Sequence, residues 1–231
     1  MIYLYAMAEP SDQPIDIAAL AEQPVRCHRE AGLCAIFSEH DGPPIPTTPD
    51  NIWRHEQVIE RLMRDRTVLP SRFGTVFASI DSLSDSLVSH GVQLLEGLEH
   101  VRGCVELGVR AICRAPAEGP DLTSNSGTQY MRQRARQERE RAERLSRASE
   151  LSDAIHSSLS EHAVQSTRKE LEDSPFVLSA AYLVRQDVNE QFRMKVQDLA
   201  IAHSSVRILC TGPWPPYHFV PRLRPAEVCH A

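Results

Sequence analysis

The stretch 128–171 contains neither proline nor glycine, and nearly every residue in it is a good helix former. Such a run predicts one long helix or a helical hairpin. Its apolar residues form only a thin stripe, so most of the helix is expected to contact water. The segments before and after it have the composition of strands. A long solvated helix between strands constrains the fold more than any other feature of the chain.

Arginines dominate the first half of this helix, but glutamates are interleaved with them. Residues 132–150 carry seven arginines and four glutamates, which leaves a net charge of +3. Opposite charges spaced in this way usually pair along a helix, and this range has no aromatic residue on which a base would stack. The formal charge of the whole chain is −6. We therefore expect no nucleic-acid partner.

The C-terminal half reads as strands alternating with helices. Residues 101–114 have a period of two, 176–184 are almost continuously apolar, and 206–210 alternate again, with a helical stripe over 188–199. This order predicts a modified ferredoxin-like α/β sandwich, modified because one strand of the ideal pattern is not visible. The stretch 115–127, rich in proline, glycine and serine, is expected to be a loop.

The N-terminal half predicts an α+β domain. Strands are expected at 2–7 and on both sides of Gly32, which suits a tight hairpin turn. Thr48 and Pro49 fit the cap and first position of a helix over 52–63, and a second helix runs from about 82 to 98. We therefore predict an α+β protein with domains at 1–99 and 100–210 and a tail at 211–231.

Motifs for catalysis or cofactor binding are missing from the sequence. The glycines do not cluster at a strand-to-helix turn, and no G-x-S-x-G is present. Cys27, His28 and Cys34 with His40, or Cys229 with His230, lack the spacing of a metal site. We expect no enzyme activity, cofactor or metal, and we expect the six cysteines to be small buried apolar residues. Two interpretations of Glu106 are a buried acid with a raised pKa and a residue that is exposed or meets an arginine. The period of two favours the second, because it places Glu106 opposite the apolar face of its strand.

The N-terminus has no basic segment before its short apolar run, so it does not fit a signal peptide. No segment reaches the roughly 18 apolar residues that a membrane-spanning helix needs. These features predict a cytoplasmic protein without a membrane partner.

Three aromatic residues stand among three prolines in the segment 211–220, and Trp214 and Tyr217 are two of them. Such a segment is stiff, has large apolar faces and loses little side-chain entropy on packing. Two interpretations remain open. The segment folds back over its own sheet, or it is a rigid platform for a partner.

Four passages make the chain resemble the gas vesicle F/L family over nearly its full length. They are residues 2–6 (IYLYA), 68–77 (VLPSRFGTVF), 176–184 (FVLSAAYLV) and 211–217 (TGPWPPY), the last followed by Phe219. The resemblance implies an α+β N-terminal domain, a ferredoxin-like C-terminal domain and a tail. It also implies a role in gas vesicle formation without catalytic residues, with the small hydrophobic shell subunit, and other gas vesicle accessory proteins, as partners.

The resemblance implies shell subunits that are very apolar, and we expect their assembly to need a soluble partner that masks or delivers them. We expect the contact near Leu69, Pro70, Arg72 and Phe73, because Pro70 interrupts a strand there. An alternative is that Arg72 and Phe73 only hold the two domains together. A rival function is that of a ferredoxin-like regulatory protein that binds a small molecule between its sheet and helices.

Overall fold

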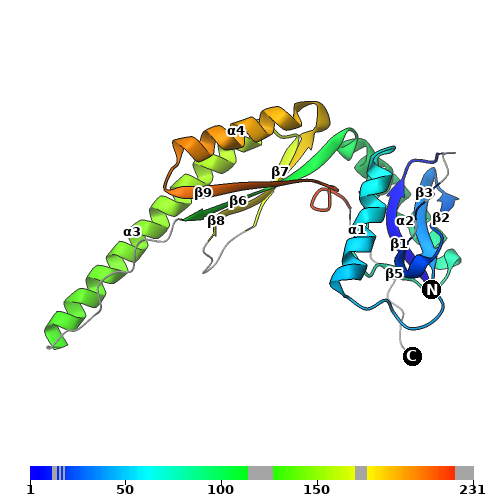
Figure 1. Ribbon diagram of the computed structural model, residues 1–231, viewed down its shortest axis with the longest axis horizontal. Helices are drawn as coiled ribbons and strands as arrows, with labels where there is room; N and C mark the ends of the chain where they lie inside the picture. The colour runs from blue at the N-terminus through cyan, green and yellow to red at the C-terminus, as the bar shows by residue number, and fades with distance from the viewer. Residues whose placement is uncertain (12–14, 16, 18, 114–126, 170–175, 222–231) are drawn as a thin grey trace. The chain divides into compact units, whose positions relative to one another are not determined.

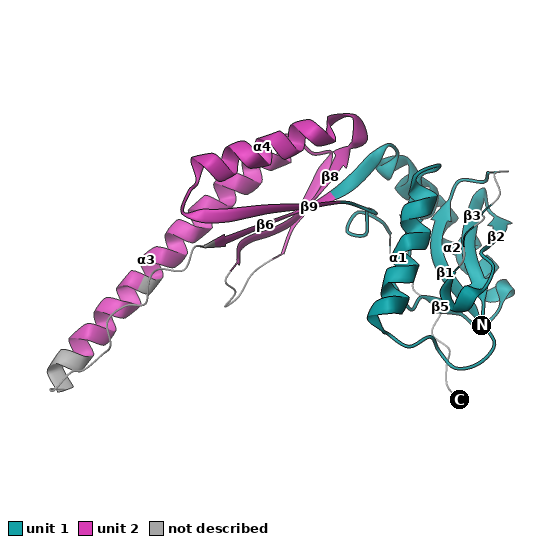
Figure 2. Cartoon of the chain, viewed as in Figure 1, with its two compact units in different colours: residues 1–106, 213–231 teal, residues 107–212 magenta. Residues whose placement is uncertain are grey.

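The computed structural model describes residues 1–11, 15, 17, 19–113, 127–169 and 176–221 (Figure 1). Of the loop expected at 115–127, all but Gly127 lies outside these residues, as do Cys229 and His230, and Gly127 begins a helix. The chain divides into two compact units, Met1–Glu106 with Pro213–Ala231, and Leu107–Gly212 (Figure 2). The first unit therefore takes residues from both ends of the described chain.

The first unit is built on an antiparallel sheet with its earliest strand in the interior. The strand order is β2-β3-β1-β4, and β5 also pairs with β1. The strands are β1 (Ile2–Ala8), β2 (Arg26–Glu30), β3 (Leu33–Glu39), β4 (Val68–Pro70) and β5 (Val76–Phe77). Every residue of β1 is buried, so its alternation of tyrosines with aliphatic residues marks two covered faces.

The hairpin between β2 and β3 forms as predicted. Its two turn residues, Ala31 and Gly32, have φ of 50° and 77°, which matches the twist of the flanking strands. Cys27 and Cys34 lie on these two strands and form a disulfide. The expectation that all six cysteines are free is therefore wrong for this pair, because the hairpin brings the two side chains together across the strands.

Two helices with well-formed N-termini pack on this sheet. In α1 (Pro49–Met63) the Thr48 side chain accepts a hydrogen bond from the backbone of Asn51, as the sequence predicts. In α2 (Ile80–Val101) Ser79 is the cap. The short 3-10 helix η1 (Leu20–Glu22) precedes β2. The apolar stripe of α2 is narrower than expected, since Val88 is 63% exposed and Leu95 41% exposed.

The core on the α1 side of the sheet is where the N-terminal strand, α1 and the segment after Pro70 meet. Side chains from β1 and β3 alternate into it, and α1 contributes three aliphatic residues at helical spacing, Val58, Ile59 and Leu62. Phe73 and Tyr217 pack on the edge of the same cluster. This cluster brings the interrupted strand and the C-terminal aromatic segment onto one core.

The second unit has the element order strand, helix, strand, strand, helix, strand, and its sheet has the order β7-β8-β6-β9. The elements are β6 (Cys104–Cys113), α3 (Gly127–Ser160), β7 (Gln165–Arg168), β8 (Phe176–Arg185), η2 (Gln186–Val188), α4 (Asn189–Ala202) and β9 (Val206–Trp214). The sequence did not predict β7.

The long helix is shorter than the sequence predicts, because it ends at Ser160 and residues 165–168 are a strand. β7 pairs antiparallel with β8, from Gln165 opposite Leu183 to Arg168 opposite Ala180. Its four residues are polar and it lies at the edge of the sheet, so it has no apolar pattern to reveal it.

Helices α3 and α4 pack on one face of the sheet in the second unit, as Figure 1 shows. Alternate residues of β6 and β8 point at them and join one core cluster with Ile155, Tyr182 and Phe192. The middle of α3 remains exposed and carries ion pairs such as Arg136 with Glu140 at 2.7 Å. No helix in the described part of the chain is long and apolar enough to cross a membrane.

Candidate partner-binding site

The turn at residues 71–75 interrupts one edge of the first unit's sheet. β4 before it and β5 after it both pair with β1. The backbone N–H of Ser71 donates to Tyr5 O at 2.8 Å, and Thr75 O accepts from the N–H of Leu4 at 2.9 Å. Within the turn, Thr75 N–H donates to Arg72 O at 3.1 Å. The irregular backbone therefore has hydrogen-bond partners at both ends.

The buried side chains of Tyr3 and His55 hydrogen-bond to the backbone of this turn. His55 Nε2 lies 3.0 Å from Ser71 O, which can only accept, so Nε2 carries the proton and Nδ1 accepts from the Tyr3 hydroxyl at 3.0 Å. The Tyr3 oxygen in turn accepts from Gly74 N–H at 3.1 Å. Burial lowers the pKa of His55 to about 4, so the ring is neutral at physiological pH.

Phe73 completes an aromatic cluster around this histidine. Its ring centroid lies 5.9 Å from that of Tyr3 and 5.7 Å from that of His55, both in edge-on arrangements. Phe73 is half-buried, whereas Arg72 is exposed and its side chain has no partner among the described residues. The turn thus presents a guanidinium beside a partly exposed aromatic ring on a fixed backbone.

Leu69 and Pro70, which the sequence places in the same patch, are buried. Pro70 is the last residue of β4 and is paired with Ala6. Leu69 has no exposed surface, and a Cβ built on Gly97 of α2 would lie 3.4 Å from its Cδ1. These two residues therefore support the turn from within, and only Arg72 and Phe73 reach the surface.

The C-terminal aromatic segment folds back onto the core of the first unit. Pro215, Pro216 and Phe219 are buried, and the Tyr217 hydroxyl donates to Glu56 Oε1 of α1 at 2.8 Å. Trp214 is 43% exposed. Tyr217 is therefore held in place by the same helix that carries His55, and Trp214 is the aromatic residue of the segment that is most available to a partner.

Glu106 anchors the same segment, and the expectation that it lies on an exposed face is wrong. Only 5% of its surface is exposed. Its two carboxylate oxygens accept from the backbone N–H of His218 at 2.9 Å and from the His218 ring Nδ1 at 2.7 Å. The face of β6 opposite the apolar residues is covered at this point by residues more than a hundred positions later in the chain.

The titratable groups of this site are shifted toward their neutral forms. Burial raises the pKa of Tyr3 and of Tyr217. Burial also raises the pKa of the Glu56 carboxyl, although the hydrogen bond from Tyr217 opposes the shift. These groups act as hydrogen-bonding supports for the surface.

Tyr3, His55, Glu56 and Glu106 join these segments, and the sequence did not identify any of the four as part of the partner-binding site. One signal for His55 is present in the sequence, because it lies between Ile52 and Ile59 at helical spacing and therefore on the inner stripe of α1. Glu56 lies at helical spacing between the same two isoleucines, but the sequence does not identify the partners of Glu56 and Glu106, which come from the distant C-terminal segment.

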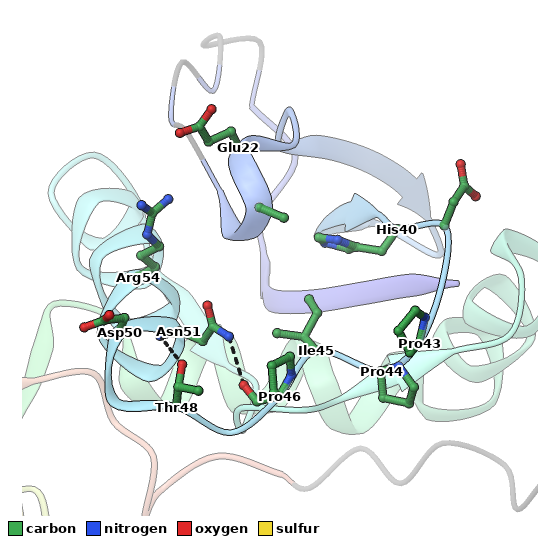
Figure 3. Close-up of a pocket in the computed structure, with 12 residues that line it drawn as sticks. Glu22, His40, Pro43, Pro44, Ile45, Pro46, Thr48, Asp50, Asn51 and Arg54 are labelled. Atoms are coloured by element: carbon green, nitrogen blue, oxygen red, sulfur yellow. Dashed lines mark hydrogen bonds between the residues drawn. The ribbon is translucent and has the colours of Figure 1, made fainter.

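A second feature of the first unit is a pocket of about 620 Å³ between η1, the loop after β3 and the start of α1 (Figure 3). The buried ring of His40 reaches into its middle, Ile45 and the prolines of 43–46 form one wall, and Arg54 lies at its rim. In the described part of the chain no three side chains of the metal-binding types form a cluster.

Comparison with known proteins places these features in a family. The model of the family "Gas vesicle synthesis protein GvpL/GvpF" matches residues 1–221. This chain is 24% identical to gas vesicle protein F1 of Halobacterium salinarum over 95% of this chain and 92% of that protein. It is 29% identical to gas vesicle protein L of a Streptomyces species over 94% and 91% of the two chains.

The fold is shared with solved structures of the same class. The crystal structure of GvpF from Anabaena sp. PCC7120 superposes with a TM-score of 0.80 at 20% identity and covers 98% of both chains. That of GvpF from Microcystis aeruginosa has a TM-score of 0.77 at 19% identity, over 94% of this chain and 98% of that one. This is a gas vesicle protein by class. The chain belongs to the GvpL/GvpF family, which implies a role in gas vesicle formation.

Proposed function

We propose that this protein is an accessory factor that binds the hydrophobic gas vesicle shell subunit and supports assembly of the vesicle wall. The observation that carries the proposal is the turn at residues 71–75, which holds Arg72 and Phe73 at the surface of the first unit. Membership of the GvpL/GvpF family supports a role in gas vesicle assembly. The geometry of the turn supports a contact between the shell subunit and Arg72 and Phe73.

A pre-ordered turn suits the binding of an aggregation-prone partner. Its backbone is fixed by Tyr3, Tyr5 and His55, so little conformational entropy is lost when a partner binds. Aromatic residues and arginines are typical of the hot spots of protein interfaces, where a few residues supply most of the binding energy. In this proposal Leu69 and Pro70 support the turn, and they do not touch the partner.

The C-terminal aromatic segment extends the same surface in the proposal. Tyr217 and Phe73 pack on one core cluster, so displacing Tyr217 loosens the support of the turn. Trp214 supplies a further exposed aromatic ring. We also propose that the second unit is a ferredoxin-like domain, which its element order and strand order support. The space between its sheet and helices is filled by core side chains, which favours a partner-binding role over the binding of a small molecule there.

A pull-down with the purified shell subunit tests the contact. Phe73→Ala and Arg72→Glu are expected to reduce the retained shell subunit at least tenfold, a change of about 1.4 kcal/mol or more. Arg207→Glu, at an exposed arginine of β9 in the second unit, is the matched control and is expected to bind as the unmodified chain does.

Folding of each variant is checked by its urea unfolding midpoint. Phe73→Ala removes ring contacts with Tyr3 and His55 and lowers stability, whereas Arg72→Glu changes only an exposed side chain. Undiminished retention of the shell subunit by folded Arg72→Glu and Phe73→Ala would refute the proposed contact.

A further inference from the structure

The pocket beside η1 contains a hydrogen-bond donor whose direction is fixed by the residues behind it. His40 follows β3, has only 8% of its surface exposed, and places its Nε2 at 2.7 Å from Ser38 Oγ. Ser38 Oγ lies 2.8 Å from the hydroxyl of Tyr5, and that hydroxyl accepts from Leu20 N–H at 3.2 Å. These four residues form one chain of hydrogen bonds from the 3-10 helix to the pocket.

The chain allows one assignment of its protons. Tyr5 is fully buried, and Ser38 Oγ is its one acceptor among the described residues, so the tyrosine proton goes to Ser38. Ser38 then has its own proton to donate, and His40 Nε2 is the acceptor that the described residues offer it, so we assign Nε2 as unprotonated. The neutral ring therefore carries its proton on Nδ1. Burial lowers the pKa of His40, which keeps the ring in this neutral form.

The Nδ1–H of His40 has no partner in the described part of the structure, and it is not among the buried polar atoms without one. Because its side chain lines the pocket, this donor is accessible from the pocket (Figure 3). A donor held in one direction in the wall of an open pocket is the kind of polar group that orients a ligand. The group that it suits is an acceptor such as a carbonyl oxygen.

The remaining lining defines two further properties of a ligand. Ile45 and three neighbouring prolines form an apolar wall of stiff backbone. Three exposed acidic residues, Glu22, Asp41 and Asp50, surround the pocket together with Arg54, so these residues give its rim a net charge of −2. Charge complementarity therefore favours a cationic side chain next to an apolar one.

The backbone at the pocket is held in an uncommon conformation. Ala21 and Glu22, both in the wall, have φ of 52° and 56°. Non-glycine residues in this region cost of order 1 kcal/mol each, and such residues gather at binding sites. The strained backbone of Ala21 and Glu22 thus agrees with a binding role for this pocket.

We propose that this pocket binds an extended peptide segment of a partner protein. The segment offers a backbone carbonyl to His40 Nδ1–H, an apolar side chain to the wall at Ile45, and a lysine or arginine to the acidic rim. This contact is separate from the surface at Arg72 and Phe73, and it stands whether or not the shell subunit binds there.

A titration of the full chain with two capped peptides tests the inference. The probes are acetyl-Lys-Val-Ala-Val-Lys-amide and acetyl-Glu-Val-Ala-Val-Glu-amide, followed by ¹⁵N NMR of the histidine rings and the backbone amides. The basic peptide is expected to shift His40 Nδ1 and the amides of residues 41–46, with an affinity at least tenfold above that of the acidic peptide. Its affinity is expected to fall as salt is raised.

Two sets of variants locate the contact. His40→Phe removes the donor and is expected to weaken the basic peptide about tenfold, the effect of one hydrogen bond of about 1.4 kcal/mol. If His40→Phe does not fold, the triple change Glu22→Gln, Asp41→Asn and Asp50→Asn still applies and is expected to abolish the preference between the peptides. Glu96→Gln, on the exposed face of α2, is the matched control.

Three results would overturn the inference. The first is equal affinity for the two peptides. The second is preference for the acidic peptide, which would indicate a carboxylate held by Arg54. The third is NMR chemical-shift changes that fall on residues outside the pocket. A pull-down of the shell subunit with the triple variant separates this site from the proposed function. A variant that loses peptide binding but still retains the shell subunit would support both the peptide pocket and a separate shell contact at Arg72 and Phe73.

Discussion

The Tyr217 hydroxyl donates a hydrogen bond to Glu56 across a separation of 161 positions in the sequence. Glu56 lies on α1, one residue after the histidine that holds the turn at residues 71–75. The pair thus couples the C-terminal aromatic segment to the support of the proposed partner-binding surface.

Tyr217→Phe removes this hydrogen bond and leaves the ring in place. We expect a loss of about 1–2 kcal/mol in the free energy of unfolding at pH 7, because a half-buried carboxylate loses its donor. Urea denaturation followed by circular dichroism measures the loss. Trp214→Phe, at a 43% exposed position, is the comparison and is expected to change stability by less than about 0.5 kcal/mol. Equal effects of the two changes would contradict the coupling.

Glu56 is expected to make stability fall as pH rises. Its pKa is raised above 4.5 by burial, so the folded state binds more protons than the unfolded state between 4.5 and the folded pKa. The contribution is present below pH 4.5 and is lost as pH rises through the folded value. Glu56→Gln removes this dependence, and the variant is expected to gain stability relative to the unmodified chain between pH 4.5 and 7. Parallel stability curves for the two chains over that range would show that Glu56 does not titrate differently on folding.

His55 is expected to have the opposite dependence. Its pKa falls from 6.5 in the unfolded chain to about 4 in the folded one, so stability is full above pH 6.5 and is lost as pH falls toward 4. A shift of this size corresponds to about 3 kcal/mol over the window. His55→Gln is expected to flatten this acid limb, as measured by urea midpoints at half-unit steps of pH. An acid limb of unchanged steepness in the variant would assign it to other groups.

Gly97 is expected to be essential where α2 meets the C-terminal segment. A Cβ at this position would lie 2.8 Å from Cδ of Pro221, so Gly97→Ala forces the segment away and is expected to cost about 1–3 kcal/mol. Gly91→Ala on the same helix meets only Ala31 at 3.4 Å and is expected to gain up to about 1 kcal/mol from helix propensity. Thermal unfolding of the two variants measures the difference in stability. A stabilised Gly97→Ala variant would show that Pro221 moves aside at little cost.

Local patterns in the sequence predict much of the fold, as the hairpin at Gly32, the cap at Thr48 and the long helix illustrate. These features depend on residues within a few positions of one another. β7 escapes prediction because an edge strand of four polar residues has neither alternation nor an apolar run. Solved structures of the class confirm the mixed α+β fold.

Less of the candidate site could be predicted from the sequence, because its contacts join residues that are far apart in the chain. Arg72, Phe73 and Tyr217 are visible as unusual residues, but Leu69 and Pro70 are buried by α2 and by β-sheet pairing that local sequence does not specify. Glu106 is covered by His218, a contact between residues 112 positions apart. The direction of the His40 proton depends on three partners from three segments. Such contacts are set by tertiary structure, and no short window contains them.

The first unit draws residues 213–221 from beyond the second unit, and this arrangement sets an order of events during protein synthesis. While the ribosome translates the second unit, the emerging N-terminal portion lacks Tyr217 to occupy Glu56 and His218 to cover Glu106. Its core is closed only after translation has passed residue 221. A nascent chain released before residue 213 therefore lacks both contacts, and we expect its first unit to be less stable than that of the finished molecule.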